Sequence, residues 1–376
     1  MKENHNDETT KLNFYSRQIG TYGLNTMKKL SKLNIIIFGL RGLGIEISKN
    51  IILSGPNKVF IYDYHISKKN DLCSNFYLNE NDIDIKRLDE SVVEKLKKLN
   101  DNVIVEIFDS KEKLFESLEI INTEEFYKGI NNFDVIVFTE ICHSNIINKV
   151  EKFCYENNKG FIYCGCLGLM GFIYNNFGKE FIVKEPYSNE KKIFFIKKIN
   201  KLNNNEKDFD KKENDYIKLL IEYENNMEDI LPFQKGDYIT FKEIEGMEFL
   251  NQKDSPKIFR IEKEIDNNSF IIKININEPN NINSEYIKGG IIIEYIQPIK
   301  MNFKTFEESI ENPSCDFNIL KFPSNQLNHL LLFSAQKYYD NFLSLPELNN
   351  ENIQTLFSKM PKNFIIKKLM NLILII

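Results

Sequence analysis

Residues 35–50 read IIIFGLRGLGIEISKN and decide the fold of this chain. The apolar run from Ile35 to Phe38 predicts a buried strand, and the glycines that follow it predict a tight turn. After the turn, isoleucines at helical spacing predict a helix with one apolar face. A strand, a glycine turn and a helix in this order form the first unit of a nucleotide-binding α/β sheet, which binds phosphate at the helix N-terminus.

The glycine turn departs from the nucleotide-binding pattern at one position. Gly39, Gly42 and Gly44 are present, but Arg41 stands where the second glycine of G-x-G-x-x-G lets the backbone approach a pyrophosphate. We interpret the turn as a degenerate nucleotide site in one half of a larger assembly. Arg41 could bind an anion at the helix N-terminus or plug the site, and the sequence favours neither.

The residues around the turn carry a family resemblance. They read YSRQ at 15–18, KNIILSG at 49–55 and DLCSNFYL at 71–78. In register with the turn, they resemble the inactive adenylation half of ubiquitin-activating enzymes, which is related to bacterial adenylating enzymes of molybdopterin and thiamine synthesis. FKEIEGM at 241–247 and YIKGGI at 286–291 resemble the family's first catalytic-cysteine half-domain. The resemblance spans roughly residues 12–345.

Length and composition bound the class of protein. The 376 residues, 42% of them hydrophobic, suffice for two or three compact units. A net charge of −5 provides no basic field for nucleic acid, and the apolar C-terminal run is too short and too charged to span a membrane. The N-terminus does not read as a secretory leader, so we expect a cytoplasmic and nuclear protein with reduced thiols. The six cysteines include no CxxC pair, and Cys164 and Cys166, which follow an apolar strand, are predicted to be buried.

Strands alternate with helices up to about residue 179, which predicts a mostly parallel, Rossmann-like adenylation domain. Strand-like alternation between turn signals then predicts an inserted all-β domain, and helical periodicity returns after Pro298. Within the insert, residues 186–216 are rich in Lys, Asn and Glu and are predicted to form a solvated loop. The predicted domains are a disordered tail at 1–10, the inactive adenylation domain at 11–179, the first catalytic-cysteine half-domain at 180–298 and a helical segment at 299–376. We expect the helical segment to be an incomplete four-helix bundle and Ile376 to be a truncation.

The resemblance implies a specific chemistry. In the family, the C-terminal carboxylate of ubiquitin attacks ATP, the acyl-adenylate passes to an enzyme cysteine as a thioester, and a ubiquitin-conjugating enzyme receives it. Adenylation requires cations for the phosphates and acidic ligands for Mg²⁺. The resemblance implies that ATP and Mg²⁺ are bound mainly by an active adenylation half that this chain lacks, and that no cysteine here forms the thioester.

Several positions of the local site depart from active relatives. Asp63 is retained and could hold a ribose hydroxyl, but a structural capping role is favoured. Lys86 and Arg87 could reach inward, although an exposed pair is favoured. His65 and His143 have no ligand partner at suitable spacing and are expected to be structural or solvated. The departures are His65 for a second acid, Ser74 and Asn75 for an arginine and a glutamine, Ile85 for a lysine and Glu140 for an aspartate.

Arg17 is the residue to which the resemblance gives a chemical role. It matches a family arginine that crosses to the partner adenylation half and touches the ATP phosphates. A guanidinium suits this role because it stays charged and forms two parallel hydrogen bonds to phosphate oxygens. From the residues alone, an exposed helix arginine without a role is favoured, and the resemblance is what favours the chemical role.

Other functions remain open. The chain could be a free-standing regulatory subunit, like the small subunit of the SUMO-activating enzyme, although that subunit usually lacks the β insert. It could also be a non-enzymatic module that binds a ubiquitin-like protein. An NAD-dependent dehydrogenase is disfavoured because Arg41 obstructs the pyrophosphate site. The sequence leaves open which ubiquitin-like protein is the substrate, where the active half and the thioester cysteine are encoded, and the oligomeric state.

Overall fold

The computed structural model describes residues 13–108, 124–168, 170–184, 191–202, 216–224, 233–251, 257–275, 284–312 and 324–345. The chain divides into two compact units. The first comprises Met1–Phe181 and Asn302–Ile376, and the second comprises Ile182–Met301, where the sequence predicts an insert over 180–298. The predicted tail at 1–10, residues 186–190 and 203–215 of the predicted loop, and the part of the predicted helical segment after residue 345 all lie outside the described residues.

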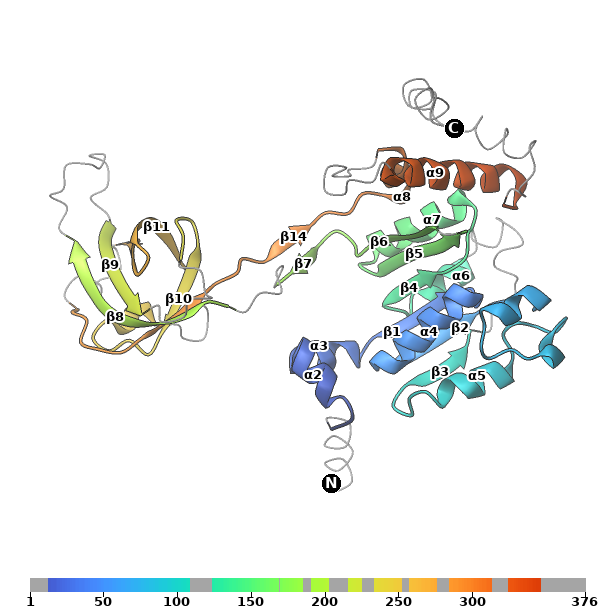
Figure 1. The fold of residues 1–376 in the computed structure, drawn as a ribbon, viewed down its shortest axis with the longest axis horizontal. Helices are drawn as coiled ribbons and strands as arrows, with labels where there is room; N and C mark the ends of the chain where they lie inside the picture. The colour runs from blue at the N-terminus through green and yellow to red at the C-terminus, as the bar shows by residue number, and fades with distance from the viewer. Residues whose placement is uncertain are drawn as a thin grey trace. The chain divides into compact units, whose positions relative to one another are not determined.

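A six-stranded sheet in the order β3-β2-β1-β4-β5-β6 forms the centre of the first unit. Adjacent strands from β3 to β5 run parallel, and β6 is antiparallel to β5. This arrangement confirms the predicted Rossmann-like α/β class (Figure 1). The strands are β1 (Asn34–Phe38), β2 (Lys58–Tyr62), β3 (Ile104–Ile107), β4 (Val135–Phe138), β5 (Gly160–Leu167) and β6 (Met170–Asn176).

The apolar run of β1 is continuous because the strand is buried on both faces of the sheet. Successive side chains of a strand point to opposite faces. Ile35 and Ile37 join a core with α4 and α5, and Ile36 and Phe38 join a second core with α6 and α7. The covering helices are α4 (Gly42–Ser54), α5 (Glu90–Lys97), α6 (Glu124–Ile130) and α7 (Ser144–Glu156).

Two short helices precede the sheet, α2 (Ser16–Tyr22) and α3 (Leu24–Leu30). The sequence carries helical periodicity from Leu12 to Leu30, but Gly23 adopts φ 80° and ends α2. The phenol of Tyr15 connects this segment to the residues between α5 and β3, because it accepts a hydrogen bond from Asn100 Nδ2 at 2.9 Å. Arg17 lies on α2, close to that attachment.

The second unit contains a closed antiparallel barrel in the order β10-β11-β12-β9-β8-β13. Its interior is filled by side chains that include Phe194, Ile221, Phe241 and Phe270, all buried. The predicted small all-β insert is therefore confirmed (Figure 1). The strands are β8 (Ile193–Leu202), β9 (Tyr216–Glu224), β10 (Tyr238–Lys242), β11 (Phe259–Asp266), β12 (Ser269–Asn275) and β13 (Ile291–Glu294).

The predicted solvated loop at 186–216 is wrong for residues 193–202, which form β8. Phe194 and Ile196 point into the barrel, and a register shift between Ile196 and Lys198 then brings Ile199 inward. The opposite face is exposed and carries Ile193 and Phe195 as well as lysines. The strand was missed because it was grouped with the Lys-, Asn- and Glu-rich residues that follow it in the sequence.

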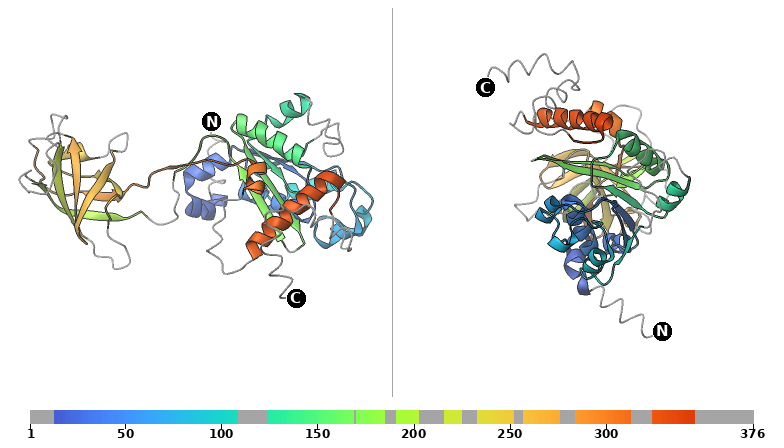
Figure 2. Two further views of the ribbon diagram at one scale, coloured as in Figure 1. Left: turned by 90° about the horizontal axis from the view of Figure 1, so that it is seen from above. Right: turned by 90° about the vertical axis from the view of Figure 1, so that its right-hand side faces the viewer.

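Strand β7 (Phe181–Val183) pairs with β14 (Ile299–Met301). After β14, the chain forms α8 (Phe306–Glu311) and α9 (Ser324–Phe342) in the first unit. Thr305 and Glu308 form a capping box that begins α8, and Phe306 and Ile310 join the core beside α7. Figure 2 shows α9 crossing the β5–β6 side of the sheet. Within the described ranges, no helix is both long and apolar enough to cross a membrane.

Candidate functional site

The glycine turn joins β1 to α4 at the carboxyl edge of the sheet. Gly39 adopts φ 95°, and a Cβ atom there would lie 2.7 Å from Glu140 Cγ. A Cβ on Gly44 would lie 2.2 Å from the carbonyl oxygen of Gly39. These two glycines are therefore required by the turn and by close contact between helix and strand.

The segment after β2 covers the N-terminus of α4. A Cβ on Gly42 would lie 2.5 Å from the Ser74 side chain, so Ser74 fills the space in front of the first helical residue. The fully buried Asn75 donates from Nδ2 to the carbonyl oxygen of Leu40 at 3.2 Å. Ser74 thus lies against the first turn of α4 and Asn75 lies against the glycine turn before it, and both side chains are neutral.

Arg87 is buried at the centre of three carboxylates. Its Nη1 atom lies 2.8 Å from Asp63 Oδ2 and 3.0 Å from Glu140 Oε1, and its Nη2 atom lies 3.3 Å from Asp71 Oδ2. The Arg87 side chain is only 3% exposed. We call Asp63, Asp71, Arg87 and Glu140 the Arg87 cluster.

The predicted exposed pair Lys86–Arg87 is wrong for Arg87, although Lys86 is exposed. Parallel strands bring their carboxyl ends to one edge of the sheet, so Asp63 after β2 and Glu140 after β4 lie close together. Burying both beside Asp71 leaves negative charge that requires a cation. Arg87 supplies that cation.

Both carboxylate oxygens of Asp63 accept hydrogen bonds from protein donors. Oδ2 accepts hydrogen bonds from Leu40 N and Arg87 Nη1, both at 2.8 Å, and Oδ1 accepts one from His65 N at 2.9 Å. Burial opposes the charged form, but the hydrogen bonds from His65 and the charge of Arg87 outweigh it and hold the pKa of Asp63 below its ordinary value. Asp63 is thus an ionised structural anchor of the glycine turn.

The pKa of Glu140 shifts in the opposite direction, above its ordinary value. Burial and the neighbouring charge of Asp63 raise its pKa, in spite of Arg87. The single positive charge of Arg87 cannot neutralise the negative charges of both Asp63 and Glu140. The cluster therefore retains an excess of negative charge.

The other predicted site residues lie around this cluster. Arg41 occupies the N-cap position of α4 with its side chain 58% exposed, and its Nε lies 3.7 Å from Asp71 Oδ1. His65 Nδ1 lies 3.0 Å from Asp63 Oδ1, so the prediction that His65 has no potential ligand partner is wrong. Ile85 is about half exposed and brings no charge.

Arg17 projects from α2 and is exposed. Within the part of the chain that the structure describes, its guanidinium makes no hydrogen bond or ion pair; only its backbone carbonyl does, by accepting from Thr21 Oγ1. The guanidinium is therefore solvent-exposed and unpaired among the described residues.

Asp71 and Arg87 are the members of the site that sequence reasoning missed. The available signal was the scarcity of arginine, which occurs only at 17, 41, 87 and 260. Arginine is the cation suited to several carboxylates in a buried position. An arginine so close in sequence to Asp63 and Asp71 could have been paired with them.

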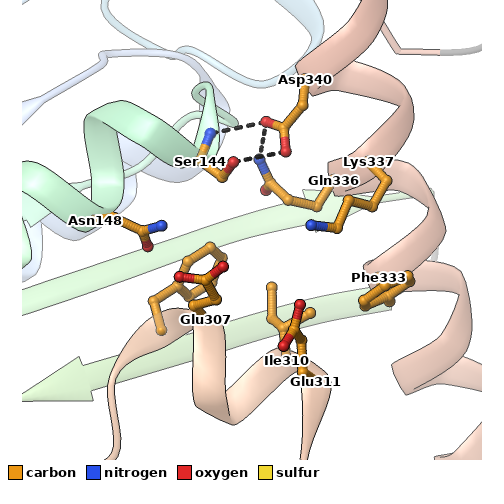
Figure 3. Close-up of a pocket in the computed structure, with 10 residues that line it drawn as sticks. Ser144, Asn148, Glu307, Ile310, Glu311, Phe333, Gln336, Lys337 and Asp340 are labelled. Atoms are coloured by element: carbon orange, nitrogen blue, oxygen red, sulfur yellow. Dashed lines mark hydrogen bonds between the residues drawn. The ribbon is translucent and has the colours of Figure 1, made fainter.

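A cavity lies between α7, α8 and α9, away from the Arg87 cluster (Figure 3). On one side of it, Asp340 accepts hydrogen bonds from Ser144 N at 2.8 Å and from Ser144 Oγ at 2.6 Å. The Nε2 atom of Gln336 donates to Asp340 Oδ1 and to the carbonyl oxygen of Cys142. A carboxylate at a helix N-terminus is favourable, so these contacts hold α9 against the start of α7.

Among the cysteines that the structure describes, Cys142, Cys154 and Cys164 are buried. The prediction that Cys166 is buried is wrong, because the side chain after Gly165 on β5 points to the exposed face. His143 caps α7, since its Nδ1 accepts from Asn145 N at 3.2 Å. It is structural, as expected.

Two family matches cover most of the chain. The ThiF family matches residues 15–200, and the FCCH domain of ubiquitin-activating enzyme E1 matches residues 223–295. Ubiquitin-activating enzyme E1 1 of Arabidopsis thaliana is 32% identical over 332 residues, which cover 87% of this chain and 27% of that protein. Ubiquitin-like modifier-activating enzyme 1 of Homo sapiens is 29% identical over 322 residues, covering 86% of this chain and 26% of that protein.

The chain belongs to the ubiquitin-activating enzyme E1 family. It spans about a quarter of the length of these E1 relatives (27% and 26%). The residues matched by the E1 FCCH domain lie within the second unit.

A crystal structure of E. coli MccB with succinimide aligns with 44% of this chain and 49% of that chain. The two are 21% identical, with a TM-score of 0.36. This likeness is too low to support a functional inference.

Proposed function

We propose that this chain forms the inactive adenylation half and the FCCH barrel of an enzyme that activates ubiquitin or a ubiquitin-like protein with ATP. The observation that supports this proposal is the Arg87 cluster. Arg87 occupies the edge of the sheet at which an α/β fold of this type binds its ligand, and it ties together the acids after β2 and β4.

The residues of this edge do not fit ATP with Mg²⁺. Three carboxylates outnumber the guanidinium groups of Arg41 and Arg87, so a triphosphate would meet net repulsion in a buried setting. Ser74 and Asn75 cover the helix N-terminus where phosphate would otherwise bind. Mg²⁺ prefers oxygen ligands in octahedral geometry, and a histidine stands in this site. ATP and Mg²⁺ are therefore bound mainly by an active adenylation half, in the same polypeptide or in another subunit.

The first unit serves that active half as a scaffold and as the source of Arg17. The exposed position of Arg17 on α2, without a partner among the described residues, supports a role toward the phosphates of a neighbouring site. An arginine donated in this way stabilises the charge that develops during phosphoryl chemistry.

The match of the barrel to the E1 FCCH domain favours this reading over a free-standing regulatory subunit. Its partners are then ubiquitin or a ubiquitin-like protein, the active half and, through the complete enzyme, ubiquitin-conjugating enzymes. The thioester cysteine lies outside this chain, and the cytoplasm and nucleus are the proposed location.

The test is a chimera in which this chain replaces the matching region of the Arabidopsis enzyme. Ubiquitin-dependent ATP–pyrophosphate exchange and thioester formation are measured for the chimera and for this chain alone. We expect activity from the chimera and none from the chain alone. A well-folded chimera without exchange, or exchange by the chain alone, would contradict the proposal.

A further inference from the structure

Each of two carboxylates in the Arg87 cluster directs one oxygen to Arg87 and the other toward His65. Asp63 bonds Arg87 through Oδ2, and its Oδ1, which also accepts a hydrogen bond from His65 N, lies 3.0 Å from His65 Nδ1. Glu140 bonds Arg87 through Oε1, and its Oε2 lies 3.8 Å from His65 Nδ1. Arg87 therefore uses only half of the oxygen atoms that these two acids offer.

The carboxylate oxygens that do not bond Arg87 and the Nδ1 atom of His65 form a triangle whose size suits the ligands of one metal ion. One ligand atom from each of Asp63, His65 and Glu140 lies within 4.8 Å of the other two. Ligands on a four-coordinate zinc ion, with bonds of about 2.1 Å, lie about 3.4 Å apart. The two distances from His65 Nδ1, at 3.0 and 3.8 Å, lie on either side of that value.

The triangle borders a cavity instead of solid core. Asp63, His65 and Glu140 line it together with Gly39, Tyr64 and Tyr339. The His65 side chain is 39% exposed, whereas Asp63 is buried, so an ion could enter from the His65 side. A fourth position is thus open to water.

We propose that Asp63, His65 and Glu140 bind a divalent first-row transition metal ion, with Zn²⁺ as the biological candidate. Imidazole nitrogen together with carboxylate oxygen favours zinc and its neighbours over Mg²⁺ or Ca²⁺. Three protein ligands with an open fourth position form a recognised zinc arrangement. The excess of carboxylates over guanidinium groups provides the negative charge that the ion neutralises.

Arg87 acts as the outer partner of this site. Its bonds to Asp63 Oδ2 and Glu140 Oε1 fix both carboxylates so that their second oxygens face His65. Outer hydrogen bonds of this kind orient the ligands of metal sites in general. His65 would bind the ion through Nδ1 as the neutral imidazole with its proton on Nε2, so the ion would take the place of the hydrogen bond between His65 Nδ1 and Asp63 Oδ1.

The test is a Co²⁺ titration of the untagged 376-residue chain after treatment with a chelator, followed by visible d–d absorption. We expect one Co²⁺ per chain and displacement of its absorption by Zn²⁺. His65→Ala and Glu140→Gln should each weaken Co²⁺ binding by more than about 100-fold, because removing a ligand costs more than removing an outer partner. Circular dichroism melting establishes that each variant is folded, and Glu140→Gln preserves the size of the side chain.

His143→Asn is the matched control. His143 Nδ1 lies 3.7 Å from one carboxylate, that of Asp340, whereas His65 lies near two. Asparagine at position 143 preserves the cap of α7. This variant should bind Co²⁺ as the unchanged chain does. Absence of saturable Co²⁺ binding below the millimolar range, or equal binding by His65→Ala, would overturn the proposal. Because neither readout involves ATP or ubiquitin, the result is independent of the proposed function.

Discussion

Arg87 Nη1 lies 2.8 Å from Asp63 Oδ2, which joins the segment before α5 to the end of β2 through a buried ion pair. The same nitrogen also reaches Glu140 after β4. One guanidinium thus connects two strands and the intervening crossover, at the edge of the sheet where related folds bind ligands. We therefore expect this contact to stabilise the carboxyl edge of the sheet and to help exclude a nucleotide from it.

Arg87→Ala should destabilise the first unit by about 3–5 kcal/mol, because it leaves buried carboxylates without their cation. Urea unfolding followed by circular dichroism measures the change. Lys86→Ala, at the neighbouring exposed position, should change the free energy of unfolding by less than about 0.5 kcal/mol. Equal midpoints for the two variants would show that Arg87 is dispensable.

Gly44→Ala should also destabilise the first unit, by about 1–3 kcal/mol, because the new Cβ would lie 2.2 Å from the Gly39 carbonyl oxygen. Gly20→Ala on α2 is the matched control. A Cβ at Gly20 meets nothing within 4 Å, and alanine in a helix interior should stabilise by about 0.5–1 kcal/mol. Thermal melting of both variants is the measurement, and a Gly44→Ala variant as stable as the parent chain would refute the required close contact.

Thiol reactivity should separate the described cysteines into two groups. Cys73 and Cys166 are exposed, whereas Cys142, Cys154 and Cys164 are buried. Burial raises the pKa of Cys154 to about 12 and that of Cys164 to about 11, so few thiolates form at pH 8. Peptide mass spectrometry after brief maleimide treatment should find Cys73 and Cys166 modified and the buried thiols protected until denaturant is added. Rapid labelling of Cys154 in the folded chain would contradict the structure.

Much of the fold is readable from the sequence because its signals are local. Strand β1 is a continuous apolar run, and Gly39 and Gly44 mark a turn that other residues could enter only with strain. Strand β8 was missed because the sequence after it is rich in Lys, Asn and Glu and the whole stretch was interpreted as one loop, although Phe194, Ile196 and Ile199 point into the barrel. The break at Gly23 was missed because helical periodicity continues on both sides of it.

The candidate site was only partly predictable, for a physical reason. Asp63 could be located because it follows an apolar strand, and strand ends are the usual ligand edge. The burial of Arg87 also depends on Glu140, which lies 53 residues away in the sequence and is brought to Arg87 by the pairing of the strands. Local sequence patterns do not report such long-range pairing of charges.

Arg17→Ala should slow ubiquitin-dependent pyrophosphate exchange by the Arabidopsis chimera about 10- to 1,000-fold. Arginines donated to phosphoryl transition states contribute about 10³–10⁵-fold elsewhere, and other cations should share the effect here. Lys29→Ala, an exposed cation on α3, is the control and should leave the rate unchanged. Unchanged exchange by a folded Arg17→Ala chimera would exclude a role for Arg17 at the partner site.

The closure of the local nucleotide site is the central claim, and equilibrium binding of ATP with Mg²⁺ to this chain alone tests it most directly. Isothermal titration calorimetry should detect no saturable binding below the millimolar range, because the Arg87 cluster and Ser74 exclude the phosphates from the α4 N-terminus. One-to-one binding in the micromolar range that Asp63→Asn abolishes in a folded chain would contradict the account.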